Sequence, residues 1–228
     1  HRRADISPLP RRGAARESHT LVLIGAARAL RRAGSTTLDV LYPPRCVACG
    51  DDEAWLCASC LRRSPSLAPP WCLACGEPGP RERCDACRAR PLALARLRAA
   101  TAFDGPIQTA IHAFKYQNLT ALAPALGELM ADTWRRHGSP VDLVVPVPLH
   151  PSRERARGYN QAAILARHAG RSLGLPVAPR ALKRSRATRE QVRLTEQQRW
   201  ANVRGAFEPR VGGRVEPEAT IAGRHVLL

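Results

Sequence analysis

The sequence predicts an α/β protein in which a parallel sheet with flanking helices follows a small cysteine-rich module. Eight cysteines lie between residues 46 and 87 and form four C-x-x-C pairs. From residue 92 to residue 228, apolar patterns of strand type alternate with patterns of helix type, which indicates a sheet with crossover helices. A chain of 228 residues is long enough for one ordinary domain beside a small one.

The four C-x-x-C pairs predict two structural zinc sites. Each C-x-x-C turn places two sulfur atoms on one side of a tight loop, and two turns supply the four thiolates that Zn²⁺ accepts. The pairs repeat as two units, C-V-A-C-G-D-D-E-A-W-L-C-A-S-C and C-L-A-C-G-E-P-G-P-R-E-R-C-D-A-C. This duplication favours two sequential sites over an interleaved, cross-braced pairing, which the spacing does not exclude. The ligands of the sequential sites are Cys46, Cys49, Cys57 and Cys60, and Cys72, Cys75, Cys84 and Cys87.

Two other uses of cysteine fit part of the pattern. An even number of cysteines also fits a disulfide scaffold, and a single C-x-x-C fits a redox centre. Four regular pairs favour zinc over both. A closed Cys₄ site has no open coordination position, so its predicted role is to hold the fold and not to catalyse. Gly50 and Gly76 each follow a C-x-x-C pair, where the turn often needs a positive φ angle.

The chain is predicted to have three parts. Residues 1–37 form an Arg-rich tail with one short helix, residues 38–90 the double zinc ribbon, and residues 91–228 the α/β domain. No apolar stretch approaches the ~20 residues of a membrane span, and reduced, metal-binding cysteines favour the cytoplasm. The net charge of +17 favours phosphate-bearing partners, which include both nucleic acids and phosphorylated small molecules.

Each element of the α/β domain has its own signal. Helices are expected where apolar residues recur every three or four positions, at 107–114, at 122–133 with a stop at Gly138, and at 159–173 with a stop at Gly174. A capping box at Thr195 and Gln198 starts a further short helix. Extended structure is expected at 92–103, at the β-branched run 141–147 as a buried parallel strand, and at 223–228.

A basic loop is predicted directly after the strand at 141–147. It carries Arg153, Arg155 and Arg157, and a helix opens at Gly158. Ligands of open α/β sheets bind at the carboxyl ends of strands, where arginine forks and helix N-termini favour phosphate. A solvated basic loop is the alternative. A second polar segment, 182–207, would by itself be a surface loop.

Together these segments resemble the ComF family, which is named for a role in bacterial competence for DNA uptake. The matching motifs are P-P-R-C-x-x-C-G, the paired cysteine knuckles, F-D-G-P-I…F-K-Y, D-L-V-V-P-V-P-L-H, R-x-x-x-R-G-Y-N-Q and T-x-x-Q-x-x-L-x-x-x-x-R-x-x-N-V-x-G-A-F. The resemblance implies a type I phosphoribosyltransferase-like fold in residues 91–228, behind the double zinc ribbon. In such enzymes a nucleophile displaces pyrophosphate from C1 of phosphoribosyl pyrophosphate (PRPP), usually with Mg²⁺.

The resemblance also implies which residues contact PRPP. The segment after the strand at 141–147 would be the pyrophosphate loop, with Arg153 and Arg157 as contacts and Asn160 and Gln161 orienting it. The segment from Lys183 to Asn202 would be a flexible loop that closes over the substrate. The full candidate set is Arg153, Arg157, Gly158, Asn160, Gln161, Lys183, Arg184, Thr188, Gln191 and Arg199.

One motif of the family is not found in these 228 residues. The PRPP-binding acidic pair followed by a Thr-Thr-Gly turn is expected directly behind an apolar strand, and the sequence stops at such a strand, Gly223–Leu228. We therefore expect the natural protein to continue, and a domain that stops here to be incomplete and unable to catalyse transfer.

Two functions compete at this point. One is a phosphoribosyltransferase that acts on PRPP and an unidentified acceptor. The other is an accessory protein that binds single-stranded DNA or a competence protein. Four Trp, three Tyr and three Phe are few for a surface that stacks bases, and Trp55 and Trp71 are expected to pack over the zinc knuckles. The oligomeric state cannot be inferred from these patterns.

Overall fold

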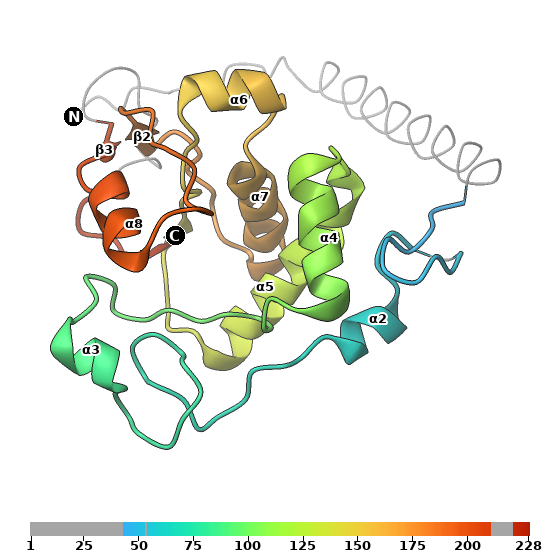
Figure 1. The fold of residues 1–228 in the computed structure, drawn as a ribbon, viewed down its shortest axis with the longest axis horizontal. Helices are drawn as coiled ribbons and strands as arrows, with labels where there is room; N and C mark the ends of the chain where they lie inside the picture. Colours follow the sequence, from blue (N-terminus) through green and yellow to red (C-terminus); the bar gives the residue numbers. More distant parts are fainter. Residues whose placement is uncertain (1–42, 53, 211–220) are drawn as a thin grey trace, which may run out of the picture. The chain divides into compact units, whose positions relative to one another are not determined.

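The computed structural model describes residues 43–52, 54–210 and 221–228 (Figure 1). The chain divides into two compact units, His1–Pro44 and Arg45–Leu228. The predicted short helix in the tail and the segment at 38–42 lie outside the described residues. Within the part that is described, no helix has the length and apolar character needed to cross a membrane.

The unit Arg45–Leu228 is mainly helical (Figure 1). Two short helices belong to its cysteine-rich part, α2 (Ala58–Arg63) and α3 (Asp85–Ala89). The others are α4 (Gly105–Tyr116), the 3₁₀ turn η1 (Thr120–Leu122), α5 (Ala123–His137), α6 (Pro151–Arg157), α7 (Gln161–Leu173) and α8 (Glu196–Val203).

Two small sheets accompany these helices. Strand β1 (Leu143–Val144) pairs in parallel with β4 (Val226–Leu227), and β2 (Leu182–Arg184) pairs antiparallel with β3 (Phe207–Pro209). Val177 adds a parallel bridge to Val144. The architecture is therefore mixed α/β with a small parallel sheet beside a cysteine-rich module, which confirms the predicted class at this level.

The predicted strand at 141–147 is shorter in the structure. Its pairing with the β4 segment begins where the Asp142 N–H donates to His225 O. It ends where the Val145 N–H donates to Leu227 O. It stops at Pro146 because proline has no N–H to donate to a sheet. The segment at 92–103 contains bends and forms no strand, apart from one isolated bridge between Ser66 and Thr101.

Helix boundaries follow their capping residues. Asp104 caps α4 by accepting the Gly105 N–H at 2.8 Å, and Gly174 ends α7 with φ 69°. Gly138 is the C-cap of α5. The predicted capping box is present at the start of α8, where Thr195 and Gln198 bond each other's backbone N–H. The predicted stops at Gly138 and Gly174 and the predicted capping box are confirmed.

The predicted basic loop is wrong at 151–157, because this segment is helix α6. His150 caps it by accepting the Ser152 N–H at 3.3 Å, Pro151 suits the first helical position, and Gly158 ends it with φ 83°. No side chain of α6 is buried, so the helix has no apolar stripe from which it could have been predicted.

The polar segment at 182–207 is also more regular than a loop. It begins in β2, ends in β3 and contains α8 between them. Lys183, predicted to contact substrate, lies in β2 and pairs its Nζ with Glu208 Oε2 at 2.8 Å. The strands were missed because each is three residues long and its partner is distant in sequence.

Apolar side chains form separate buried clusters. The largest joins α4, η1 and α5 to the first cysteine group and contains Cys46, Leu56, Cys57, Cys60, Ile107, Ala110, Ala113, Phe114, Leu122, Ala123 and Leu126. A second surrounds β1, and a third consists of Cys72, Ala74 and Cys87. The first cysteine group thus belongs to the main core, whereas the second has a small core of its own.

Helices α5 and α7 cross at close range (Figure 1). A Cβ atom on Gly127 would lie 2.5 Å from His168 Cβ, so only glycine fits there. Beside this contact, Arg135 bonds Ser172 on α7 and both Glu128 and Asp132 on α5. The Ser172 hydroxyl and Arg135 hold the pKa of Glu128 below its usual value.

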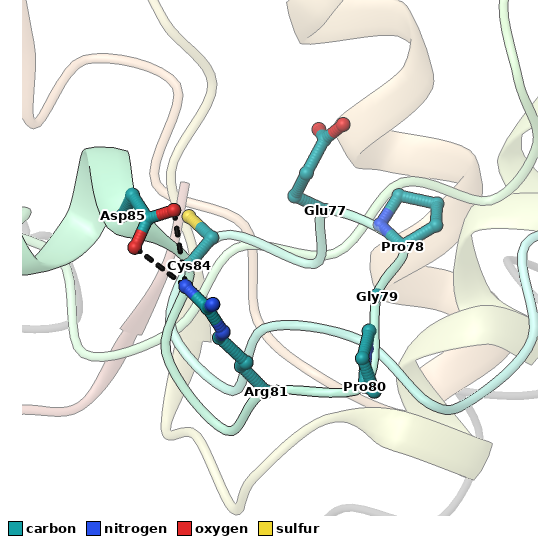
Figure 2. Close-up of a pocket in the computed structure, with 7 residues that line it drawn as sticks. All are labelled: Glu77, Pro78, Gly79, Pro80, Arg81, Cys84 and Asp85. Carbon is teal, nitrogen blue, oxygen red and sulfur yellow. Dashed lines mark hydrogen bonds and ion pairs between the residues drawn. The ribbon is translucent and has the colours of Figure 1, made fainter.

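The second cysteine-rich repeat contains a hollow of about 330 Å³ (Figure 2). Figure 2 shows Arg81 and Asp85 side by side on one edge of it, opposite Pro78. Arg81 Nη1 donates to both carboxylate oxygens of Asp85, at 2.8 and 3.1 Å. Arg88 bonds the same carboxylate. Because Asp85 is satisfied by two guanidinium groups, the hollow does not offer this carboxylate to a ligand.

Candidate metal centres and anion-binding site

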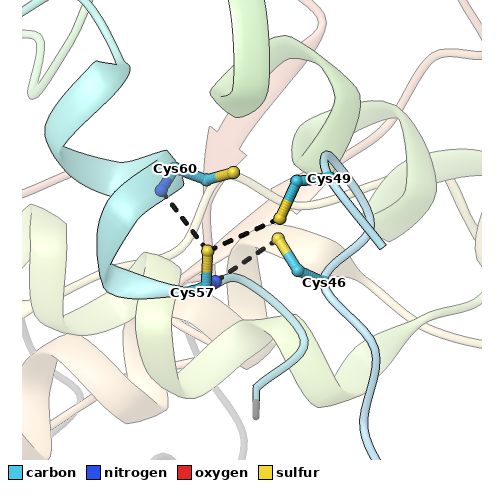
Figure 3. Close-up of side chains that lie close together, drawn as sticks. All are labelled: Cys46, Cys49, Cys57 and Cys60. Carbon is cyan, nitrogen blue, oxygen red and sulfur yellow. Dashed lines mark hydrogen bonds between the residues drawn. The ribbon is translucent and has the colours of Figure 1, made fainter. Parts of the chain in front are cut away.

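The first four cysteines form one cluster, which Figure 3 shows with the sulfur atoms turned toward one another. All four Sγ atoms lie within 4.8 Å of each other. Cys46 and Cys49 flank a turn that ends at Gly50, whose φ is 83°. Cys57 caps α2, and Cys60 lies in its first turn. A helix N-terminus therefore supplies the second pair of ligands.

Hydrogen bonds to sulfur favour the thiolate form of Cys46 in this cluster. Burial raises the pKa of Cys46, but N–H groups of Cys57, Ala48 and Cys49 outweigh burial and lower that pKa to about 6. Burial raises the pKa of Cys60, and the Arg63 guanidinium, which donates to Cys60 Sγ at 2.9 Å, opposes that rise. The thiolate is the form of cysteine that binds metal.

The other four cysteines, Cys72, Cys75, Cys84 and Cys87, form an equivalent cluster with the same 4.8 Å limit. Backbone N–H groups of Cys75 and Cys84 lower the pKa of Cys72 to about 6. The turn ends at Gly76, whose φ is 76°, as predicted. The pairing is therefore sequential, and the cross-braced alternative is wrong.

Both clusters fit structural zinc. Each has four thiols and, among the residues that the structure describes, no other potential ligand, which is the donor set of a closed tetrahedral zinc site. Zinc bound there would tie two chain turns together and leave no position for a substrate.

The second repeat is attached to the end of α5 by arginine and tryptophan side chains. The rings of Trp71 and His137 meet edge-on at 4.8 Å, and Arg98 lies 5.3 Å over the Trp71 ring. Arg96 donates to the carbonyls of His137 and Gly138 at 3.2 and 3.0 Å, where the negative end of a helix favours a cation. Trp71 therefore packs against a helix end, while Trp55 is 37% exposed.

Three of the predicted substrate residues come together around Thr188. Arg153 of α6 donates to Thr188 O at 2.5 Å, and Arg184 of β2 donates to Thr188 Oγ1. The Thr188 residue is 6% exposed. Burial and the nearby charge of Arg153 lower the pKa of Arg184. Two like charges have thus been brought together, which is unfavourable unless an anion shares them.

Arg184 retains an unused donor at this place. Its Nε is buried and bonds no acceptor among the described residues. Across that same part of the chain, neither Arg153 nor Arg184 pairs with a carboxylate. The ring of Phe207 supports the Arg184 guanidinium at 5.2 Å. Arg153 and Arg184, which both bond Thr188, form the arginine pair.

The R-G-Y-N-Q residues form a second group. Arg157 donates to Gln161 Oε1 at 3.0 Å and lies 5.6 Å over the Tyr116 ring. Asn160 accepts the Ala162 N–H at 3.0 Å, which caps α7, and donates to Val147 O at 3.2 Å. The two Asn160 bonds join the turn between α6 and α7 to the start of α7 and to the segment that follows β1. A pyrophosphate contact for Arg157 stays a prediction.

The remaining predicted residues have other roles or partners in the structure. Gly158 is the left-handed cap of α6, and Arg199 Nε donates to Gln191 O at 3.1 Å within the β2–α8 segment. The sequence analysis assigned no role to Tyr116 and Phe207, whose rings lie under the guanidinium groups of Arg157 and Arg184. Both stand in quoted family motifs, F-K-Y and G-A-F, which was the available signal.

The fold and the two cysteine clusters define a class of protein, a small α/β protein with a double zinc ribbon. The double zinc ribbon domain family matches residues 37–91. No solved structure matches the chain, so the phosphoribosyltransferase-like fold and the domain boundaries stay predictions.

Curated relatives identify the family. The DNA utilization protein YhgH of Salmonella typhi is 30% identical over 157 residues, which cover 67% of this chain and 68% of that protein. Competence protein F of Haemophilus influenzae is 31% identical over 122 residues, 51% of this chain and 53% of that protein. The chain belongs to this family, the ComF family. It spans about half to two thirds of the length of these relatives.

Proposed function

We propose that the protein binds PRPP with the arginine pair as its pyrophosphate receptor, as in type I phosphoribosyltransferases. The observation that carries the proposal is the approach of Arg153 and Arg184 to Thr188 without a carboxylate partner in the described ranges. The unused Nε of Arg184 supplies one more donor. Pyrophosphate is a dense cluster of anionic oxygens, and planar guanidinium groups bind such oxygens in a bidentate way.

The same pair suits phosphoribosyl transfer. Negative charge develops on pyrophosphate as it leaves C1, and cations already in place stabilise that charge. Lys183, Gln191 and Arg199 lie on the segment that would cover the substrate. In the described ranges, the two cysteine clusters are the only groups of three or more potential metal ligands. Mg²⁺ would therefore arrive with the phosphates of PRPP.

Replacement of Arg184 by Gln tests this proposal. Arg184→Gln should weaken the binding of magnesium pyrophosphate roughly 10- to 150-fold, because a charge-assisted hydrogen bond contributes about 1.5–3 kcal/mol. Titration calorimetry on the zinc-loaded chain measures the change. The exposed Arg180 is the matched control, since Arg180→Gln removes the same charge away from Thr188. Equal affinities of the two variants would contradict the proposal.

A second function, handling of DNA, is favoured by the names of the relatives and by the net charge of +17. A strongly basic protein attracts nucleic acid over its whole surface. We propose that the chain acts on DNA or with competence proteins in the cytoplasm, where cysteines stay reduced. The two proposed functions are compatible, because one protein can bind both DNA and PRPP.

A further inference from the structure

Three exposed rings lie on helix α4 and just before it, and packing in the core does not account for them. We infer that this row is the place where bases of single-stranded DNA stack. The row consists of Phe103, His112 and Tyr116, ends at the guanidinium of Arg157, and is called the aromatic row. The inference rests on the second proposed function, DNA handling, and adds to it a binding site with named residues.

The members of the row contact one another in sequence. The rings of Phe103 and His112 have centroids 5.7 Å apart, and those of His112 and Tyr116 are 5.8 Å apart. Arg157 lies 5.6 Å over the ring of Tyr116. Tyr116 is 66% exposed and Phe103 is 53% exposed. The row therefore offers ring surface to the solvent, with neighbouring rings inclined to one another at 47° and 83°.

The core of the protein does not account for these rings. On α4 the residues that pack inward are Ile107, Ala110, Ala113 and Phe114. His112 and Tyr116 are four positions apart, so they share another, exposed side of the helix. Large apolar groups exposed next to each other are costly in water and often mark a binding surface.

The charges beside the row favour a phosphate backbone. Lys115 is exposed and forms no ion pair with any described carboxylate. Arg157 supplies a second cation at the Tyr116 end. The carboxylate next to the row in sequence, Asp104, is engaged as the cap of α4.

Ring surface and flanking cations together fit a single strand better than a duplex. Unpaired bases expose their faces and stack on aromatic side chains whatever their sequence, while the backbone follows basic groups. In a duplex those faces are already stacked on one another. A protein partner would use the rings but would not require the cations.

The test measures the binding of a fluorescein-labelled 20-nucleotide oligo-dT to the zinc-loaded chain by anisotropy. Tyr116→Ala should weaken binding roughly 5- to 150-fold, the range for loss of one stacked base. Tyr116→Phe, which keeps the ring, should recover most of this loss. The control is Met130→Ala on α5, where a 45% exposed apolar side chain is removed outside the row.

The salt dependence of binding distinguishes the contribution of ring stacking from that of the charged side chains. Tyr116→Ala should leave the dependence of log affinity on log salt concentration unchanged, whereas Lys115→Gln should reduce the slope by about 0.7, the value for one phosphate contact on a single strand. A duplex of the same sequence should compete poorly with the labelled strand.

The outcomes distinguish the inference from the function on which it rests. If the wild-type chain does not bind the oligonucleotide, both DNA handling and the aromatic row are refuted. If the wild type binds and Tyr116→Ala binds equally well, the row is refuted and DNA handling stands. Equal competition by duplex would show that charge alone binds the strand, which also refutes the row.

Discussion

Replacement of Cys60 by serine should remove one zinc ion per chain and unfold the helical core. Cys60 is fully buried and shares a cluster with Ile107, Phe114 and Leu126 of α4 and α5. Zinc binding to a structural site contributes roughly 10–16 kcal/mol, which is comparable with the ~5–15 kcal/mol stability of a whole domain. Metal analysis by mass spectrometry and thermal unfolding followed by circular dichroism measure both effects.

The matched variant is Cys84→Ser, at a ligand of the second cluster. Among the buried side chains that the structure describes, that cluster packs with a small group of its own, Cys72, Ala74 and Cys87. Cys84→Ser should also remove one zinc ion, but most of the helical signal should persist at the temperature where Cys60→Ser has lost it. If the two variants lose their helical circular dichroism signal at the same temperature, the claim that the first cluster supports the main core is contradicted.

Replacement of Phe114 by alanine should destabilise the protein by about 3–5 kcal/mol, the usual cost of removing a large side chain from a packed core. Phe114 is 1% exposed, belongs to the main cluster and lies with its ring centroid 6.2 Å from that of Tyr159. Tyr159 also donates to Phe114 O. Urea unfolding measures the change as a lower midpoint.

Phe103 provides the control, because it is the same residue type but 53% exposed. Phe103→Ala should change the free energy of unfolding by less than about 0.5 kcal/mol. It should, however, weaken the binding of single-stranded DNA if the aromatic row is correct. A loss of stability at Phe103 equal to that at Phe114 would be inconsistent with the described packing.

The sequence was most informative where the structure is local. The eight zinc ligands could be predicted because a C-x-x-C turn places its own sulfur atoms, and duplication of the unit favoured the sequential pairing found. Helices α4, α5 and α7 could be predicted because each buries one side against the core. Helix α6 has no buried side chain, so its sequence lacks the apolar pattern of a helix and predicts a basic loop instead.

Contacts between distant segments could not be predicted in the same way. Arg153 and Thr188 are 35 residues apart, and only the pairing of β2 with β3 and the position of α6 bring them together. The family resemblance named both residues as candidates but also named Lys183, which pairs with Glu208. Pro146 and Pro148 mark a strand end, but pattern alone did not show how early pairing would stop.

The most direct test of the arginine pair is the side-chain Nε–H spectrum of the zinc-loaded chain, recorded by NMR during titration with magnesium pyrophosphate. The account predicts that the Arg184 Nε–H resonance, from a buried donor with no acceptor among the described residues, shifts to saturation while that of Arg180 does not move. An unchanged Arg184 resonance at saturating pyrophosphate would contradict the account.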